Sequence, residues 1–337
     1  MSMSAMTTNG TPGSAPAGLL SHEWIERAQR RLARHVLRTP VVRSDDLDRL
    51  AGARLWLKAE NLQRGGSFKL RGALLAVGEL RDRGSSGVAA HSTGNHAIAV
   101  ALAAREYGLP AILVLPGDVL PAKAARVREA GAEVLIVGTG LAERTAAVDE
   151  VALTRGFDVV DPYQNPFVVA GQGTATAELL TQVHSAGGRL DALVLPVGGG
   201  SAVAGACLVA ARHGVAVVAA EPAAVPALTA ALAAGEPVTV PGLPTVADGL
   251  RPDRIGRLPF DVVRSALHEV IQVDEAGIVA GMRMALDAAR LVVEPAAACG
   301  LAAAVQFAAA GQARDIGVLL TGGNVDLNLI STILAEA

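Results

Sequence analysis

Short runs of Val, Leu, Ile and Ala alternate along the chain with longer Ala-rich stretches. The short runs are apolar at nearly every position, which is typical of parallel strands buried on both faces. Strands are therefore expected at 54–59, 87–92, 111–116, 133–138, 191–197, 215–221 and 316–323. The longer stretches predict helices at 69–83, 95–107, 119–130 and 141–155, from about residue 201, after Pro222 and from about residue 325.

This alternation predicts an α/β protein built on parallel sheets. It is tightest between about 85 and 160, so a small domain is expected at 85–163, inserted in a large domain made of 21–84 and 164–337. Residues 1–20 carry no charged side chain and are mostly Ser, Thr, Gly, Pro and Ala, so they are expected to form a disordered tail. Gly and Pro gather where the strands end, and α/β proteins bind ligands at that edge.

The chain has 337 residues, of which 51% are hydrophobic and 18% charged, and its net charge is −3. No basic run stands out, so neither nucleic acid nor an anionic membrane is expected as a partner. The uncharged runs 192–211 and 295–313 are broken by Pro and Gly or made mostly of Ala, which does not favour membrane spans. Cys207 and Cys299 show no spacing pattern, which predicts reduced, buried residues of a cytoplasmic protein.

A glycine-rich loop occurs in the segment LVLPVGGGSAVAG. Consecutive glycines let backbone N–H groups converge on an anion, and the helix that follows adds partial positive charge. A phosphate is therefore the expected ligand of Gly198, Gly199, Gly200 and Ser201. Two other interpretations remain open from these residues alone. The loop could be a tight turn without a ligand, or a nicotinamide-binding loop with Glu221 on the ribose, although Val203 replaces the third glycine of that motif.

A lysine stands in an unusual setting in the segment NLQRGGSFKLRGA. Lys69 lies between Phe68 and Leu70 and follows two glycines. Lysine forms a Schiff base with an aldehyde, and partial burial lowers its pKa toward the range in which the amine is a nucleophile. Together with a phosphate-binding loop, such a lysine indicates a cofactor with both an aldehyde and a phosphate, which is pyridoxal 5'-phosphate. A structural lysine at the start of a helix is the alternative.

Eight segments carry, in the same order, a resemblance to a known family. They are TPVVRS, KAENLQRGGSFKLRGA, HSTGNHAIAVA, DPYQNPFVVAGQGTATAE, LPVGGGSAVAG, TVADGL, VVEPAAACGLAA and LLTGGNVDL. The chain resembles the fold type II pyridoxal-phosphate enzymes, and among them the serine/threonine dehydratase (threonine ammonia-lyase) and serine racemase group. The resemblance implies a fold similar to that of the tryptophan synthase β subunit, in which two parallel-sheet, three-layer α/β domains hold the cofactor between them.

The same resemblance implies roles for residues of the site. Lys69 is expected to bind the cofactor as a Schiff base and to act as general base, with Phe68 against the pyridine ring. The ring 3-oxygen is expected at Asn95 and the ring nitrogen at Thr321. Residues 198–201 are expected to hold the phosphate, with Glu294 near the cofactor. The substrate carboxylate is expected at the loop of Ser92, Thr93, Gly94, Asn95 and His96.

The implied reaction is elimination of water and ammonia from L-threonine or L-serine to give a 2-oxo acid, in a homodimer. A racemase is an alternative, because Thr93 keeps the hydroxyl with which racemases of the family protonate the opposite face of Cα. Another β-hydroxy amino acid such as 3-hydroxyaspartate is a further alternative, with Arg71 or Arg144 as candidate ligands of its second carboxylate. A protein that binds the cofactor without catalysis is the alternative from another class.

Departures from the family pattern alter two expectations. Gly65 replaces the threonine usual before GSFK, which is expected to loosen the approach to Lys69. Glu221 matches an acid that binds a divalent cation in the racemase branch, but Ala227 stands where a second acid is expected. Because a hard cation needs several oxygen ligands, no metal is expected.

Overall fold

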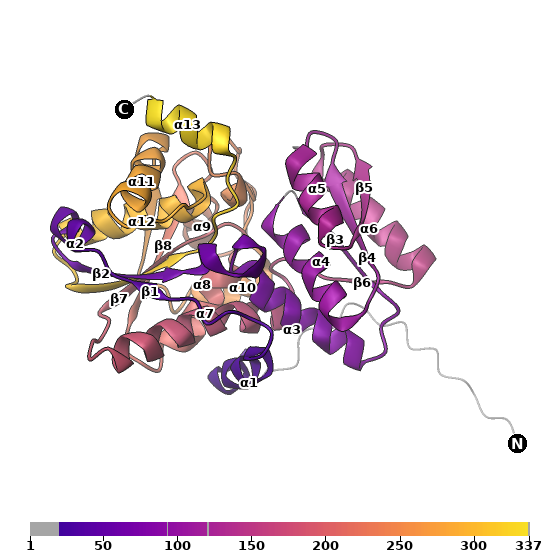
Figure 1. Ribbon diagram of the computed structural model, residues 1–337, viewed down its shortest axis with the longest axis horizontal. Coiled ribbons are helices and arrows are strands. Elements are labelled where there is room, and N and C mark those ends of the chain that lie inside the picture. The colour runs from indigo at the N-terminus through magenta and orange to yellow at the C-terminus, as the bar shows by residue number, and fades with distance from the viewer. Residues whose placement is uncertain (1–19, 93, 120, 336–337) are drawn as a thin grey trace, which may run out of the picture.

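The computed structural model describes residues 20–92, 94–119 and 121–335. The predicted disordered tail, apart from its last residue, lies outside these ranges. The described chain forms two lobes, each built around one sheet, and the lobes lie side by side (Figure 1).

Six strands form the sheet of the larger lobe. They are β1 (Val41–Val42), β2 (Arg54–Ala59), β7 (Ala192–Pro196), β8 (Ala216–Pro222), β9 (Glu269–Val273) and β10 (Asp315–Leu320). The order in the sheet is β1-β2-β10-β7-β8-β9, and every pairing is parallel except that of β1 with β2. The interior strands are buried at almost every position, as their uninterrupted apolar runs predict.

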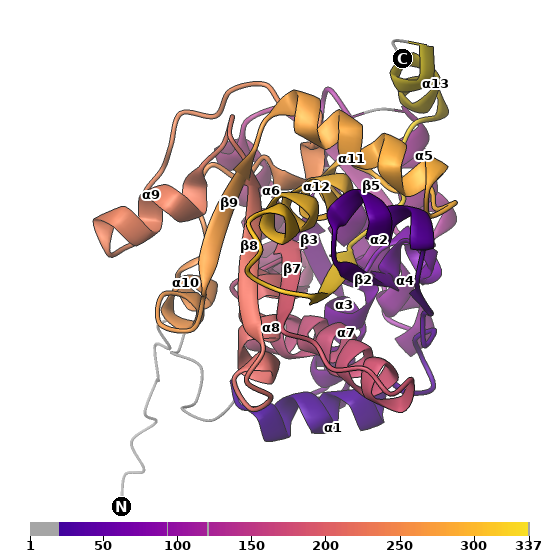
Figure 2. The ribbon, with the colours of Figure 1, turned by 90° about the vertical axis from the view of Figure 1, so that its left-hand side faces the viewer.

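Helices cover both faces of this sheet (Figure 2). One face carries α2 (Asp45–Ala51), α11 (Glu275–Asp287), α12 (Pro295–Ala309) and the end of α13 (Leu327–Ala335). The other carries α7 (Pro166–Ser185), α8 (Ser201–Ala210), α9 (Ala227–Ala234) and α10 (Arg257–Val263). The remaining elements of this lobe are α1 (His22–Leu32) and the 3-10 turns η1 (Glu60–Leu62), η2 (Arg64–Gly66) and η3 (Asp248–Leu250).

The smaller lobe has an all-parallel sheet in the order β5-β4-β3-β6. Its strands are β3 (Val88–His91), β4 (Ala111–Pro116), β5 (Glu133–Val137) and β6 (Asp158–Val159). One face packs against α4 (Asn95–Tyr107) and α5 (Pro121–Glu129), and the other against α6 (Leu141–Arg155). Since all four strands fall within 85–163, we propose those residues as the small domain and 21–84 with 164–337 as the large domain.

The helix α3 (Lys69–Asp82) joins the two lobes, because it packs against α4 of the small lobe and α7 of the large one. The predicted α/β class with two largely parallel, helix-covered sheets is confirmed. Two helices begin later than expected: α5 begins at Pro121 rather than at residue 119, and α9 begins at Ala227 rather than directly after Pro222. Pro226 precedes α9, and a proline disfavours helical conformation in the residue before it.

No helix in the described part of the chain has the length and apolar character needed to cross a membrane. Cys207 in α8 and Cys299 in α12 are buried and unpaired, as predicted. Burial raises the pKa of both thiols, that of Cys207 to about 12, so neither is a reactive thiolate near neutral pH.

Candidate active site

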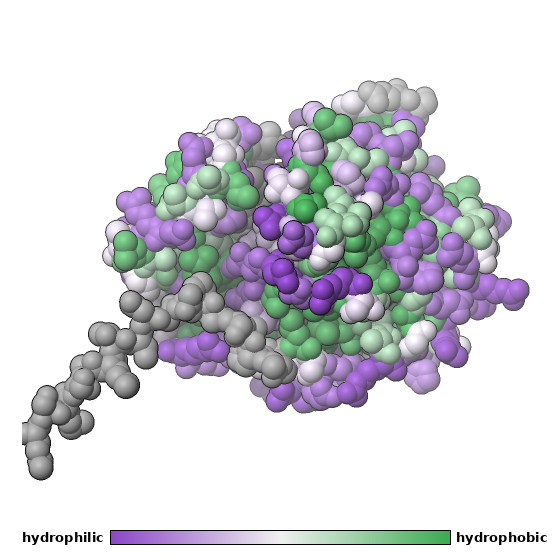
Figure 3. Space-filling view, turned by 180° about the vertical axis from the view of Figure 1, so that it is seen from behind, coloured by the Kyte–Doolittle hydropathy of each residue, from purple (hydrophilic) through white to green (hydrophobic). Residues whose placement is uncertain are grey.

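A cleft of about 970 Å³ lies between the two lobes. Residues that directly follow strands form part of its wall, as expected where parallel strands end. Hydrophilic side chains border the hollow between the lobes where the molecule is seen from behind (Figure 3). Eight residues named for the site from the sequence line this cleft: Lys69, Ser92, Gly94, Asn95, His96, Arg144, Gly199 and Glu294.

The segment before Lys69 is fixed to the end of β10. The backbone N–H of Phe68 donates to the carbonyl oxygen of Thr321 at 3.0 Å, and Ser67 forms a β-bridge with Gly322. Lys69 follows as the first residue of α3. The predicted neighbours Phe68, Lys69 and Thr321 are therefore brought together, although they come from distant parts of the sequence. Phe68 and Thr321 are both buried.

The amine of Lys69 has a lowered proton affinity. Burial lowers the pKa of Lys69 to about 8, while the carboxylates of Asp161 and Glu294 act in the opposite direction. The amine lies 5.1 Å from the centre of the Phe68 ring. A neutral amine is accessible near pH 8, which a Schiff-base lysine or a general base requires.

The glycine loop connects β7 to α8 and leaves its backbone donors free. Gly200 has a φ of 98°, in the left-handed region, and a Cβ atom on Gly199 would lie 2.1 Å from the ring of Tyr163. Within the described ranges, no group accepts a hydrogen bond from the backbone N–H of Gly198, Gly199, Gly200 or Ser201. Donors without acceptors at the first turn of a helix are typical of an anion site, and these fit a phosphate.

The loop after β3 presents a second set of donors. The N–H of Gly94 donates to the Ser92 hydroxyl at 3.2 Å, whereas the N–H groups of Asn95 and His96 meet no acceptor in the part of the chain described. The His96 ring donates from Nε2 to the Val160 carbonyl at 2.8 Å, and burial lowers the pKa of His96 to about 3. His96 is thus neutral, and its backbone N–H rather than its ring can receive a carboxylate. Thr93 lies outside the described residues.

Asn95 of the small lobe and Glu294 of the large lobe are in direct contact at the cleft. Nδ2 of Asn95 donates to the two carboxylate oxygens of Glu294 at 2.7 and 3.0 Å. Glu294 is the residue that precedes α12, and its own N–H donates to the Gly322 carbonyl at 3.0 Å. Burial raises the pKa of Glu294 to about 7. A protonatable carboxyl therefore stands beside the amide that the resemblance assigns to the cofactor ring.

Arg71 does not reach the cleft, so its expected role with a substrate carboxylate is wrong. Its side chain is fully buried and donates to both oxygens of Glu60 at 2.8 Å and to Glu178 at 2.8 and 2.9 Å. Lys58, also buried, donates to Glu178 at 2.8 Å. All four charges are thus satisfied within the large lobe.

Glu221 lies away from the cleft and acts as a helix cap. Its carboxylate accepts from the N–H groups of Leu228 and Thr229 at 2.8 and 3.1 Å and from the Thr229 hydroxyl, at the start of α9. The described residues contain no group of three or more His, Cys, Asp or Glu side chains that could hold a metal ion.

Gly65 is tightly packed, so the expected looser approach to Lys69 is wrong. A Cβ atom on Gly65 would lie 2.7 Å from Leu102 and 3.5 Å from Ile98, both on α4. Its φ of 72° also disfavours a side chain. The glycine lets α4 of the small lobe approach the turn before Lys69.

Several cleft residues were not predicted individually. Tyr163 packs on Gly199, and Asn324 donates to Asn95 Oδ1 at 2.8 Å. Both lie inside segments that carry the family resemblance, DPYQNPFVVAGQGTATAE and LLTGGNVDL. The sequence therefore identified these segments as part of the site, although it gave these two residues no role. Lys123 and Arg126 on α5 also line the cleft, and no local pattern distinguishes them from solvated basic residues.

An amine of lowered pKa lies on a cleft between two α/β lobes, and a loop of free N–H donors borders the same cleft. This arrangement fits an enzyme that holds a phosphorylated aldehyde. A family model described as pyridoxal-phosphate dependent enzyme matches residues 32–322. The chain belongs to this family, its cofactor is pyridoxal 5'-phosphate, and the fold type II resemblance is confirmed. The nicotinamide interpretation of the glycine loop is therefore wrong.

Known relatives cover nearly the whole chain. It is 36% identical to serine racemase of Oryza sativa subsp. indica, over 94% of this chain and 96% of that protein. It is 35% identical to L-threo-3-hydroxyaspartate ammonia-lyase of Saccharomyces cerevisiae, over 91% and 94% of the two chains. The solved structure of a threonine deaminase from T.th. matches with a TM-score of 0.87 and 37% identity, over 91% of this chain and 99% of that one.

Proposed function

We propose that this enzyme is a dehydratase, an ammonia-lyase that converts L-threonine or L-serine to a 2-oxo acid and ammonia. The observation that carries the proposal is the Lys69 amine, of lowered pKa, on the same cleft as two separate sets of unpaired backbone donors. One set suits a phosphate and the other a carboxylate, as an amino-acid reaction on this cofactor requires.

The residues that would hold the cofactor each have a distinct task. The N–H groups of 198–201 would bind the phosphate at the first turn of α8. Asn95 would donate to the ring oxygen, Phe68 would pack on the ring, Thr321 would meet the ring nitrogen and Lys69 would bind the aldehyde. When bound, the cofactor supplies an electron sink for charge left at the substrate Cα.

The chain's own groups then bind the substrate and move protons. The N–H groups of Asn95 and His96 hold the carboxylate at the start of α4. The neutral Lys69 amine removes the proton from Cα, a role worth about 10²–10⁴-fold in rate. The protonated Lys69 then returns this proton to the β-hydroxyl, which would leave as water. The enamine that remains would convert to its imine form, and hydrolysis of the imine gives the 2-oxo acid and ammonia.

The direct test is incubation of the purified enzyme with L-serine, L-threonine and L-threo-3-hydroxyaspartate. We expect 2-oxo acid and ammonia in equal amounts from the first two. Lys69→Ala should abolish both turnover and the visible absorbance of the bound cofactor. Absence of 2-oxo acid from all three substrates would rule out the dehydratase, and turnover by Lys69→Ala would remove that lysine from its role.

A second candidate substrate is a β-hydroxy amino acid with two carboxylates, such as 3-hydroxyaspartate. Arg144, Arg251 and Arg254 line the cleft, and none of them pairs with an acidic side chain among the described residues. Arg144 donates instead to the Thr139 carbonyl at 2.6 Å. If Arg144 binds a second carboxylate, Arg144→Gln should raise KM for 3-hydroxyaspartate and leave KM for serine unchanged. Arg155→Gln, at the other end of α6, is the matched control.

Racemisation is the other activity to measure, because Thr93 retains a hydroxyl in the substrate loop. We expect any D-serine formed to disappear in Thr93→Ala while 2-oxo acid formation persists. A Thr321→Asp variant should raise racemisation relative to elimination, since a carboxylate at the ring nitrogen favours its protonation and a longer-lived carbanion.

We further propose that the enzyme works as a homodimer in the cytoplasm, which sedimentation and cell fractionation would test.

A further inference from the structure

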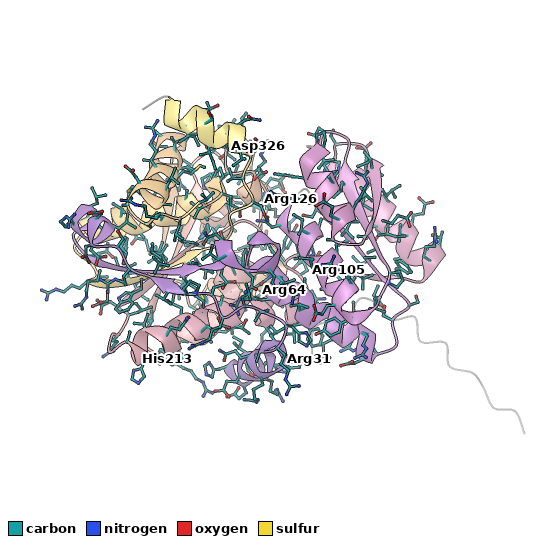
Figure 4. The ribbon with its side chains drawn as sticks, viewed as in Figure 1. Arg31, Arg64, Arg105, Arg126, His213 and Asp326 are labelled. Carbon is teal, nitrogen blue, oxygen red and sulfur yellow. The ribbon has the colours of Figure 1, made fainter. Side chains whose placement is uncertain are left out.

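A continuous series of hydrogen bonds runs from Arg126 of the small lobe through Asn324 of the large lobe and back to Asn95 of the small lobe. Arg126, on α5, donates from Nη1 to Oδ1 of Asn324 at 3.0 Å. Nδ2 of Asn324 donates to Oδ1 of Asn95 and to the carbonyl of Gly65, both at 2.8 Å. Nδ2 of Asn95 donates in turn to Glu294 at 2.7 and 3.0 Å. Arg126 lies at the junction of the two lobes (Figure 4).

Arg126 determines which end of each side-chain amide in this series donates and which end accepts. A side-chain amide has an acceptor end and a donor end, whereas a guanidinium has donors only. Arg126 therefore binds only the oxygen of Asn324 and leaves the N–H end for Asn95 and Gly65. Half a turn of the Asn324 amide would put its NH₂ group against the guanidinium and its oxygen against two other oxygens. The same constraint passes to Asn95, whose oxygen is held by Asn324 and whose N–H groups must point the other way.

The turn before Lys69 is shaped around Asn324. A Cβ atom on Gly66 would lie 2.3 Å from Oδ1 of Asn324, and Gly66 has a φ of 75°. The N–H of Gly323 donates to the Gly66 carbonyl at 2.9 Å, which holds the two segments together. Asn324 is thus enclosed by the segment that leads to Lys69, so its orientation is coupled to that segment as well as to Asn95.

We propose that Arg126 is a positioning residue that acts through Asn324 to orient the Asn95 amide with its N–H groups available to the cofactor. The proposal rests on the role proposed above for Asn95, a donor to the ring oxygen of pyridoxal phosphate. A donor stabilises negative charge on that oxygen, and the opposite end of the amide repels it. Because a hydrogen bond from a charged donor is stronger than one between neutral groups, one arginine can hold both amides.

The test compares Arg126→Met with Arg128→Met, which loses the same charge from an exposed position on the same helix. For Arg126→Met we expect the dissociation constant of pyridoxal phosphate to rise about tenfold, the size of one charge-assisted hydrogen bond. The visible absorption spectrum of the bound cofactor should shift toward the form with an uncharged ring oxygen. The value of kcat should fall more than KM rises, Arg126→Lys should recover most of the loss, and Arg128→Met should match the wild type.

Two further variants separate this inference from the proposed function. Asn95→Ala should shift the spectrum at least as far as Arg126→Met, and in an Asn324→Ala background Arg126→Met should add nothing. A spectral shift in Asn95→Ala with none in Arg126→Met overturns the inference alone, and no shift in either overturns both. A rise in KM from Arg126→Met that persists without the Asn324 side chain would mean direct substrate contact, and this also overturns the inference.

Discussion

At the scale of single residues, Glu294 carries an unusual electrostatic cost. Its side chain is almost fully buried, and burial raises its pKa to about 7, with Asp248 adding to the effect and Asn95, Lys123 and Lys69 opposing it. In the unfolded chain the pKa of a glutamate is about 4.3, so between these values the folded protein binds a proton that the unfolded chain does not. The stability from this uptake is full below the unfolded value and is lost as pH rises through about 7.

We therefore expect Glu294→Gln to remove this pH dependence. Between about pH 5 and about pH 8, the free energy of unfolding of the wild type should fall relative to the variant by up to about 3 kcal/mol, the value of roughly two pKa units. Urea titrations of both proteins without cofactor, at several pH values, measure the difference. A difference that is constant across the pH range would contradict the prediction.

Lys69 gives a second pH dependence, in which the neutral form of the group is the one present at high pH. Since burial lowers its pKa to about 8, the amine becomes neutral as pH rises through that value. Only the neutral amine attacks an aldehyde, so the rate at which cofactor-free enzyme binds pyridoxal phosphate covalently should rise with pH and level off above about 8. Stopped-flow absorbance measures this rate. A rate that still climbs steeply toward the ordinary lysine value of about 10.4 would exclude the lowered pKa.

At the scale of elements, the turn before α3 depends on two left-handed glycines. We expect Gly66→Ala to cost more stability than Gly84→Ala, although both residues have positive φ, 75° and 84°. Nothing lies within 4 Å of a Cβ atom on Gly84, so that change costs only the backbone strain of about 1–2 kcal/mol. Gly66→Ala also meets Asn324 and should cost about 1–3 kcal/mol more. Equal losses in thermal unfolding would contradict the packing argument.

The elements that could be predicted from the sequence are those with local signals. Uninterrupted apolar runs located the interior strands, and motifs next to strand ends located Lys69 and the glycine loop. Arg71 was misassigned because Glu60 and Glu178, which neutralise it, come from other elements and leave no trace in its own segment. Gly65 was misjudged for a similar reason, since its constraint comes from Leu102 on α4. Contacts between distant segments produce no local pattern in the sequence. Roles of side chains that depend on such contacts therefore cannot be predicted from a single sequence.

At the scale of the whole molecule, α5 connects the lobes at two points. Lys123 forms an ion pair with Asp248 of η3, and Arg126, one turn along, bonds to Asn324. Both pairs cross from the small lobe to the large lobe at the cleft. A partly exposed ion pair contributes at most about 1 kcal/mol to folding, so stability alone gives little reason for its position. Its position instead suits a contact that holds the lobes closed over the substrate.

We expect Lys123→Asp to open the cleft, because two carboxylates would then face each other across it and their repulsion is relieved when the lobes separate. KM for the amino acid should rise by about tenfold, while the free energy of unfolding changes by less than about 1 kcal/mol. Adding Asp248→Lys restores an opposite pair with the charges exchanged and should return KM close to the wild-type value. Arg128→Asp on the same helix, away from the cleft, controls for the change in net charge. If the exchanged pair fails to restore KM, the two charges do not act on each other across the cleft, and closure of the lobes must depend on other contacts.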